Sequence, residues 1–166
     1  MIINFHTVSL KKKFPLQISR GIHDRSQNLF IEIIKDGITA WGECAPGKTE
    51  GASSAREVEI HLKRLIDSKV DSLALYEVKQ RAKELNIPPC AFAGFDIALW
   101  DWKAKKANMS LKDLLGLPSP HVPTSLTVGI NPPEIVKERV ELILKNSQVR
   151  ALKIKLGSKE GIEYDK

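Results

Sequence analysis

Two lysines near the end of the sequence are the residues whose type and spacing could do chemistry. Lys153 and Lys155 lie in a run of alternating apolar and basic residues, 151–157. Residues two apart in a β-strand share a face, so both amines point to one side and the apolar residues to the other. A lysine amine can bind a carboxylate or transfer a proton, so the surroundings of this face decide its function.

Two structural settings suit this lysine pair. An open sheet with helices on both faces would bury two unpaired cations, which is energetically costly. A strand of a β/α barrel avoids that cost if its C-terminal end opens into the mouth of an active site. An edge strand whose lysine face is solvated avoids it as well. Spacing alone leaves both settings open.

The elements around the lysine pair indicate a parallel sheet. Residues 125–130 read as a strand, and Asn131 is a suitable N-cap for the helix after it. The lysine-bearing strand, 150–156, follows that helix and is closed by Gly157. Strand, helix and strand in this order form a βαβ unit, which implies parallel pairing. Residues 118–120, Pro-Ser-Pro, are typical of a linker before this unit.

The first half of the chain has a different pattern. Residues 2–9 form one expected strand, and a loop, 10–26, follows it. Residues 28–43 form two more strands that meet at Asp36-Gly37, the signal for a two-residue hairpin turn. This predicts a three-stranded antiparallel meander.

Three helices are expected after the meander. Ser54 and Glu57 have the spacing of a capping box, which opens the first helix. The periodicity of apolar residues places the helices at about 54–67, 73–85 and 91–106. The expected fold class of this half is therefore α+β.

The composition is that of an ordinary globular protein. Of 166 residues, 42% are hydrophobic and 28% charged, and no apolar run approaches the ~18 residues of a membrane span. The N-terminus lacks the pattern of a signal peptide, so we expect a cytoplasmic protein. The net charge of +6 includes one lysine run, 11–13, without interleaved aromatics, which favours a solvated loop over a nucleic-acid site. Cys44 and Cys90 are expected to be reduced and packed.

Four motifs in order resemble the muconate-lactonizing subgroup of the enolase superfamily. They are Trp-Gly-Glu-Cys-Ala-Pro at 41–46, Phe-Asp-Ile-Ala-Leu-Trp-Asp at 95–101, Thr-Val-Gly-Ile-Asn at 127–131, and the Lys-x-Lys pair. The sequence departs from the family pattern at 108–110, Asn-Met-Ser, where relatives usually carry a glycine. This difference is expected to alter only a turn. Within the family, Ile-Ser-Arg-Gly at 18–21 is similar to dipeptide epimerases of the L-Ala-D/L-Glu type.

The resemblance implies a fold. Residues 1–120 would form an α+β capping domain, and 121–166 would begin a (β/α) TIM-type barrel that is truncated after its second strand. Such a barrel takes about 250 residues, so only an N-terminal fragment of a family member would be present. The family holds Mg²⁺ on the third, fourth and fifth barrel strands. No residue of this chain is therefore assigned as a metal ligand, and Mg²⁺ is expected only in the intact enzyme.

The resemblance also implies a reaction, proton transfer at the carbon next to a carboxylate. Lys155 would be the general acid/base on one face of the substrate, and Lys153 would help to hold the carboxylate and offset charge on the enolate. Arg20 and Thr127 would contact the substrate, a dipeptide such as Ala-Glu. A surface arginine beside a turn glycine explains Arg20 equally well. Three acidic residues of the motifs are expected to be structural rather than catalytic: Glu43, Asp96 and Asp101.

Other functions stay open at this point. A muconate cycloisomerase or an o-succinylbenzoate synthase would share the Lys-x-Lys pair. A non-catalytic remnant could use the capping region as an interaction module. The 166-residue chain alone is expected to be inactive and to associate, since its barrel strands would expose unpaired edges. We expect the intact enzyme to be a homo-oligomer whose partner is a small-molecule substrate, with no nucleic-acid or membrane partner.

Overall fold

The computed structural model describes residues 1–119, 123–146 and 148–165, which fall into two compact units. The first unit comprises Met1–Leu10 and Ser26–Pro118, and the second comprises Lys11–Arg25 and Ser119–Lys166. The predicted boundary near residue 120 does not anticipate that 11–25 belong with the second unit. Pro120 of the expected linker lies outside the described residues.

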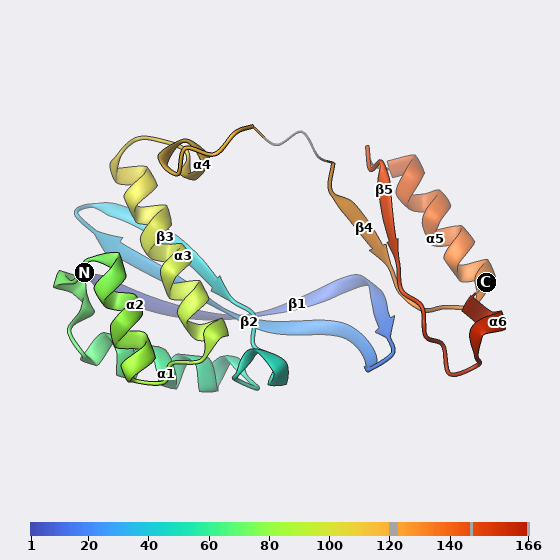
Figure 1. Cartoon of the computed structure of the whole chain (residues 1–166), viewed down its shortest axis with the longest axis horizontal. Coiled ribbons are helices and arrows are strands. Elements are labelled where there is room, and N and C mark those ends of the chain that lie inside the picture. Colours follow the sequence, from blue (N-terminus) through green and yellow to red (C-terminus); the bar gives the residue numbers. More distant parts are fainter. Residues whose placement is uncertain (120–122, 147, 166) are drawn as a thin grey trace. The chain divides into compact units, whose positions relative to one another are not determined.

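A three-stranded sheet runs through the first unit (Figure 1). Its strands are β1 (Ile2–Ile18), β2 (Gly21–Lys35) and β3 (Ile38–Cys44), in that order. The predicted antiparallel meander is confirmed. Asp36 and Gly37 at the β2–β3 turn have φ of 53° and 75°, the left-handed values that a two-residue hairpin turn with the twist of the strands requires.

The predicted loop 10–26 is wrong, because β1 and β2 extend through it and leave only two residues between them. In β1, half-buried Lys12 and Phe14 alternate with exposed Lys11, Lys13 and Pro15, which is the two-residue period of a strand. The guanidinium carbon of Arg139 lies 5.2 Å from the centre of the Phe14 ring. The lysine run concealed this alternation in the sequence, because the stem of Lys12 counts as polar although it packs.

Helices follow the sheet along the chain, as predicted. α1 (Ala55–Asp67) begins after Ser54, whose hydroxyl accepts the Glu57 amide at 3.2 Å, while the Glu57 carboxylate accepts the Ser53 amide at 2.7 Å. α3 begins at Pro89, two residues before the predicted start, because proline suits the first turn of a helix. The remaining helices of the first unit are α2 (Leu75–Glu84), α4 (Leu111–Leu114) and two short 3₁₀ turns, η1 (Lys48–Glu50) and η2 (Val70–Ser72).

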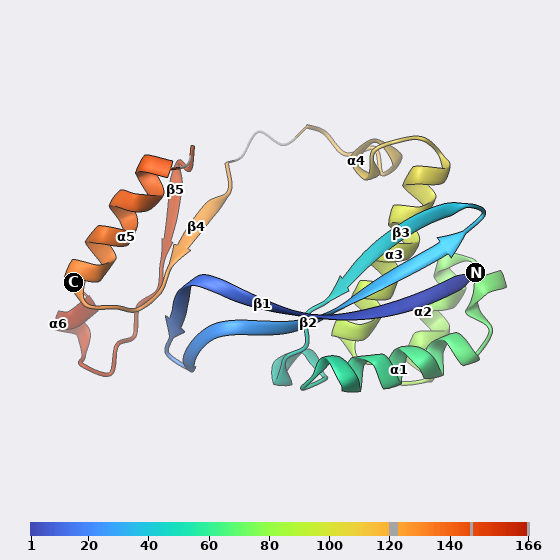
Figure 2. The ribbon, with the colours of Figure 1, turned by 180° about the vertical axis from the view of Figure 1, so that it is seen from behind.

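The helix α3 (Pro89–Lys106) lies directly against β3, behind the sheet in the view of Figure 2. Glycines on both elements permit this close approach. A Cβ added to Gly42 would overlap the Gly94 carbonyl oxygen, and a Cβ added to Gly94 would overlap the Cys44 sulfur. The core beneath this crossing is fully buried and apolar, and its largest members are Phe95, Leu29, Ile31, Ile33, Leu62 and Leu65.

The second unit contains the predicted βαβ arrangement. β4 (Ser125–Val128) pairs in parallel with β5 (Ala151–Ile154), and α5 (Pro133–Asn146) connects them. The short helix α6 (Ile162–Asp165) follows β5. Both strands are shorter than predicted. Asn131 is not the N-cap that we expected, because α5 begins two residues later and the Asn131 side-chain amide donates to the Gly129 carbonyl at 2.9 Å.

No helix in the described ranges is both long and apolar enough to cross a membrane.

Candidate active site

The parallel register of β4 and β5 aligns three of the four predicted site residues. Thr127 lies opposite Lys153, and the Lys155 amide donates to the Val128 carbonyl at 3.0 Å, which continues the ladder beyond β5. Because side chains alternate along a strand, Thr127, Lys153 and Lys155 share one face. Thr127 and Lys153 are exposed, and Lys155 is half-buried.

The opposite face of this strand pair is apolar. Val128 is buried, whereas Ile154 and Leu156 are 46% and 59% exposed. These two side chains and α5 line a groove of about 500 Å³, which Lys155 also borders. The prediction that the apolar residues of the lysine strand pack against helices is therefore met in part, because α5 covers only some of this face.

The end of β4 is hydrogen-bonded to the hairpin tip, which is the part of the β1–β2 hairpin formed by residues 11–25. The Ile130 amide donates to the Gln17 carbonyl at 2.9 Å. Gly129 is required at this contact, since an added Cβ would lie 2.9 Å from both the Gln17 nitrogen and the Gln17 oxygen. The Thr-Val-Gly-Ile-Asn motif thus holds the hairpin tip at the C-terminal end of β4.

Arg20 lies in a pocket of about 260 Å³ at the C-terminal ends of both strands. The hairpin tip forms one wall and the loop after β5 forms another, with Ile130 from the end of β4. The cationic groups Arg20 and Lys159 meet apolar side chains here. The complete lining is Gln17, Ile18, Ser19, Arg20, Gly21, Ile22, Ile130, Gly157, Ser158 and Lys159.

The structure brings Arg20 to the strand ends but not into one pocket with the two lysines. Lys155 lies two residues before the pocket wall that begins at Gly157, and it borders the neighbouring groove. Lys153 lies further back along β5. The strand ends therefore present the cationic groups of Arg20 and Lys159. The strand face beside them presents those of Lys153 and Lys155. Both sets of cations are suited to a substrate with carboxylate groups.

A residue that sequence reasoning missed holds the loop after β5. The Asp165 carboxylate accepts the Gly157 amide at 2.7 Å and the Ser158 amide at 3.2 and 3.3 Å. Its only sequence signal is an aspartate eight residues after a strand-ending glycine, which is too common to single out.

Magnesium has no ready ligand set in the described part of the chain. Residues 1–119, 123–146 and 148–165 contain no group of three or more His, Cys, Asp or Glu side chains able to hold a metal ion. Since Mg²⁺ prefers several oxygen ligands around it, the described residues do not fit the ion.

The acidic residues of the first-unit motifs have structural partners or apolar surroundings. The Asn28 side-chain amide donates to Glu43. Asp101 accepts the Trp41 amide at 2.8 Å and the Lys105 ammonium at 2.7 Å, which fastens α3 to β3. Burial raises the pKa of the Asp96 carboxyl above its usual value. These contacts favour the structural interpretation of Glu43 and Asp101.

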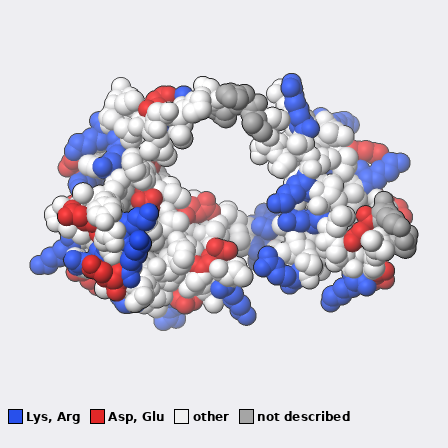
Figure 3. Space-filling model, in the orientation of Figure 1, with Lys and Arg blue, Asp and Glu red and all other residues white. Residues whose placement is uncertain are grey.

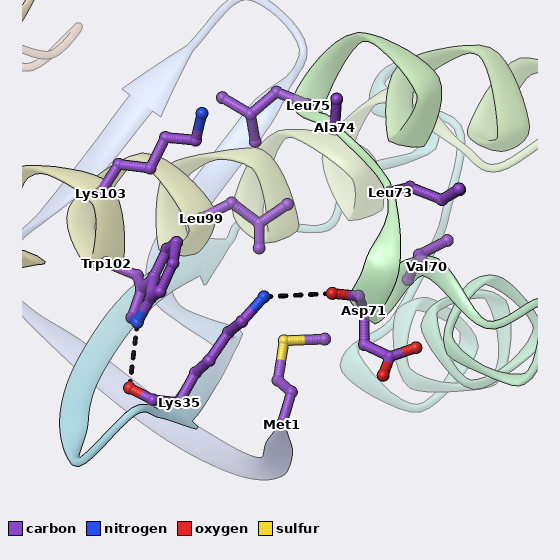
Figure 4. Close-up of a pocket in the computed structure, with 10 residues that line it drawn as sticks. All are labelled: Met1, Lys35, Val70, Asp71, Leu73, Ala74, Leu75, Leu99, Trp102 and Lys103. Carbon is purple, nitrogen blue, oxygen red and sulfur yellow. Dashed lines mark hydrogen bonds between the residues drawn. The ribbon is translucent and has the colours of Figure 1, made fainter.

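A small cleft in the first unit is also structural (Figure 4). It measures about 80 Å³, and its lining is mostly apolar. Two hydrogen bonds cross it: the Lys35 ammonium donates to the Asp71 carbonyl at 3.1 Å, and the Trp102 indole donates to the Lys35 carbonyl at 3.0 Å. Lys35 also lies 4.8 Å from the centre of the Trp102 ring. These contacts join β2 to α3 and to the turn around Asp71, which favours a structural role for Lys35 and Trp102.

The two units differ in their formal net charge. The first unit has 13 Lys and Arg against 13 Asp and Glu, and the second has 13 against 7, so the whole formal charge of +6 belongs to the second unit. Lys and Arg side chains accordingly predominate over the drawn face of β4, β5 and the hairpin tip (Figure 3). This field attracts anionic ligands to the unit with the candidate site residues.

Known proteins resemble the whole length of the chain. A hydrophobic dipeptide epimerase from Flavobacteria bacterium (strain MS024-2A) is 52% identical over 166 residues, which cover 100% of this chain and 48% of that protein. The crystal structure of a dipeptide epimerase from Cytophaga hutchinsonii complexed with Mg and the dipeptide D-Ala-L-Val has a TM-score of 0.85 at 26% identity, over 98% of this chain and 45% of that one. A substrate-liganded L-Ala-D/L-Glu epimerase from Bacillus subtilis has a TM-score of 0.87 at 25% identity, over 99% and 47%.

The chain spans about half the length of the relatives that it matches. Its first 116 residues identify the family on their own, because residues 2–116 match the family model of the mandelate racemase / muconate lactonizing enzyme, N-terminal domain. The sheet, the helices and the parallel strand pair agree with that assignment. This chain belongs to the mandelate racemase / muconate lactonizing enzyme family of the enolase superfamily.

Proposed function

We propose that the full-length gene product is a dipeptide epimerase. The observation that supports this most is the strand face that Thr127, Lys153 and Lys155 share, beside a cationic pocket at the strand ends. The 52% identical relative is named a hydrophobic dipeptide epimerase, which supports the same reaction class. The family's alternatives are a cycloisomerase and an o-succinylbenzoate synthase, and a relative named as the latter is only 27% identical.

The proposed reaction exchanges a proton at the carbon next to a carboxylate of the substrate. The neutral amine of Lys155 accepts the proton as the carbon–hydrogen bond breaks, and the electron pair moves into the adjacent carboxylate to form an enolate. Lys153 pairs with the anionic oxygens and offsets their charge. An acid on the opposite face, which the described residues do not supply, returns a proton to the carbon and gives the epimer. The described residues supply a base for one face only.

The pocket with Arg20 suggests which dipeptides fit. Arg20 and Lys159 are suited to a substrate carboxylate, because charged donors bind it through strong hydrogen bonds. The side chains of Ile18, Ile22 and Ile130 offer apolar contacts to a second side chain. A dipeptide such as Ala-Glu, or one with a hydrophobic residue, satisfies these contacts. Thr127 is proposed to contact the substrate from the face that it shares with Lys153.

The test is an epimerisation assay of the full-length gene product with Mg²⁺, against a dipeptide library that includes Ala-Glu and hydrophobic dipeptides. Exchange of the dipeptide's α-proton for deuterium in D₂O, monitored by NMR, reports the proton-transfer step. Lys155→Ala should lower kcat by about 10²–10⁴-fold, the usual contribution of a general acid or base. Lys145→Ala, at an exposed position in the last turn of α5, is the matched control and should retain full activity.

Two results would contradict the proposal: no dipeptide is epimerised, or Lys155→Ala is as active as the unchanged protein. Residues 1–166 alone should give no turnover in the same assay, because their described part offers one proton-transfer face and no metal-binding cluster. We also propose that the full-length protein is a homo-oligomer, which size-exclusion chromatography with light scattering would check.

A further inference from the structure

The loop after β5 has a conformation that needs support from outside itself. Gly157 has φ of +99°, a region that side chains other than glycine rarely adopt. The Ser158 hydroxyl accepts the Glu160 amide at 3.1 Å, and the Ser158 carbonyl accepts the Gly161 amide at 3.2 Å. These short-range bonds form a turn, but none of them joins the turn to the rest of the unit.

The carboxylate of Asp165 provides the support. It accepts the Gly157 amide at 2.7 Å and the Ser158 amide through both oxygens, at 3.2 and 3.3 Å. Hydrogen bonds to a charged acceptor are roughly twice as strong as neutral ones, so two amides on one carboxylate form a firm clamp. Asp165 is half-buried, which limits competition from water.

The clamped loop adjoins both parts of the candidate site. Gly157 follows Lys155 by two residues, so its backbone fixes where the lysine strand ends. Gly157, Ser158 and Lys159 form the wall of the pocket that contains Arg20. A Cβ built on Gly157 would lie 3.7 Å from the Cβ of Ser19, so the loop is in close contact with the hairpin tip.

We propose that Asp165 is a positioning residue for the reaction: by holding the Gly157 and Ser158 amides, it fixes both the end of the strand that contains Lys155 and the loop wall that faces Arg20. This inference rests on the proposed function. Asp165 touches neither the substrate nor the reacting atoms in this role. It acts through the backbone, so its removal should displace Lys155 without removing any group that does chemistry.

Three variants of the full-length gene product test the clamp. Asp165→Ala removes all three hydrogen bonds and should lower kcat by roughly 30–100-fold, since a displacement of about 1 Å can cost 10²-fold in rate. KM should rise by a smaller factor than kcat falls, because Lys159 moves with the loop whereas Arg20, on the hairpin, stays in place. Asp165→Asn keeps one acceptor oxygen and should lose only about 3–10-fold. Asp24→Ala, at the only other aspartate of the second unit, is the control and should stay within about twofold.

Hydrogen–deuterium exchange, resolved to single amides, tests the clamp without relying on activity. In Asp165→Ala the Gly157 and Ser158 amides should exchange at least about 10-fold faster, while amides of α3 stay unchanged. Unchanged exchange at both amides would overturn the clamp, and faster exchange with an unaltered kcat would overturn its role in positioning. If the unchanged protein epimerises no dipeptide, the proposed function fails, and the exchange result still decides whether Asp165 holds the loop.

Discussion

In the first unit, Leu29, Ile31 and Ile33 are fully excluded from solvent, whereas in the second unit Ile154 is 46% and Leu156 is 59% exposed. Only Val128 and Ile130 are buried hydrophobic residues among the described residues of the second unit. Most of the hydrophobic stabilisation therefore resides in the first unit.

The unit with little buried apolar surface is the one with the basic charge and all four candidate site residues. The charges of the first unit cancel, and its polar groups fasten helix to strand, as Asp101 does for Trp41 and Lys105. The comparison separates a unit that holds most of the buried apolar surface from a unit that holds the net charge and the candidate site residues.

The largest difference should appear when leucine is truncated in each unit. Leu62→Ala removes a fully buried side chain and should lower the free energy of unfolding by about 3 kcal/mol, through lost burial and a residual cavity. Leu156→Ala, at a 59% exposed position, should cost under about 1 kcal/mol. Urea unfolding followed by tryptophan fluorescence suits the first unit, which contains Trp41, Trp100 and Trp102.

An equal loss of unfolding free energy in Leu62→Ala and Leu156→Ala would contradict the difference in stability between the two units. Far-UV circular dichroism reports both units and serves as the control for Leu156→Ala, because fluorescence alone reports only the first unit.

A smaller effect is expected where α3 crosses β3. Gly94→Ala places a methyl group on the Cys44 sulfur and 2.9 Å from the Glu43 carbonyl oxygen, so the crossing must open at a cost of about 2 kcal/mol. Gly47→Ala is the matched control, since its Cβ would meet only the Glu50 side chain at 3.4 Å. The thermal midpoint of Gly94→Ala should fall by several degrees, and that of Gly47→Ala should change little. A stable Gly94→Ala would mean that the two elements are not in tight contact.

The last effect is confined to alkaline pH and is absent below pH 9. Burial raises the pKa of the Cys44 thiol from 9.0 to about 12. Below pH 9 the thiol is neutral in the folded and unfolded states, so its contribution is fully present. Between pH 9 and 12 only the unfolded state ionises, and the free energy of unfolding should fall by about 1.4 kcal/mol per pH unit from this thiol.

Cys44→Ala should make that decline shallower, as measured by urea unfolding at several pH values above 9. Leu62→Ala is the control, because it should lower stability equally at every pH. Identical slopes in Cys44→Ala and the unchanged protein would show that Cys44 does not titrate on unfolding.

Local signals in the sequence predicted most of the fold. The Asp36-Gly37 turn, the Ser54 cap and the periodicity of α1 each depend on residues close in sequence, so each could be read directly. The hairpin tip could not, because a run of three lysines does not reveal that Lys12 is half-buried between exposed Lys11 and Lys13. The Asn131 cap failed because its side chain found a backbone partner, the Gly129 carbonyl, in the preceding turn.

The candidate site was predictable only in part. Alternation placed Lys153 and Lys155 on one face, and the register with β4 added Thr127 to it. The pocket around Arg20 depends on contacts between residues more than a hundred positions apart, such as the Gln17–Ile130 hydrogen bond. The Asp165 clamp depends on loop geometry that no local pattern encodes.

The chain crosses between the two units three times, near residues 10, 25 and 118. Cleavage near residue 118 would therefore leave the hairpin tip covalently attached to the first unit. A piece that starts at residue 119 would lack the Gln17 carbonyl that receives the Ile130 amide. Neither unit is one continuous segment of the chain, so neither can be excised or exchanged as a single piece. Recombination between relatives in this family should therefore keep the hairpin tip and the strand pair together.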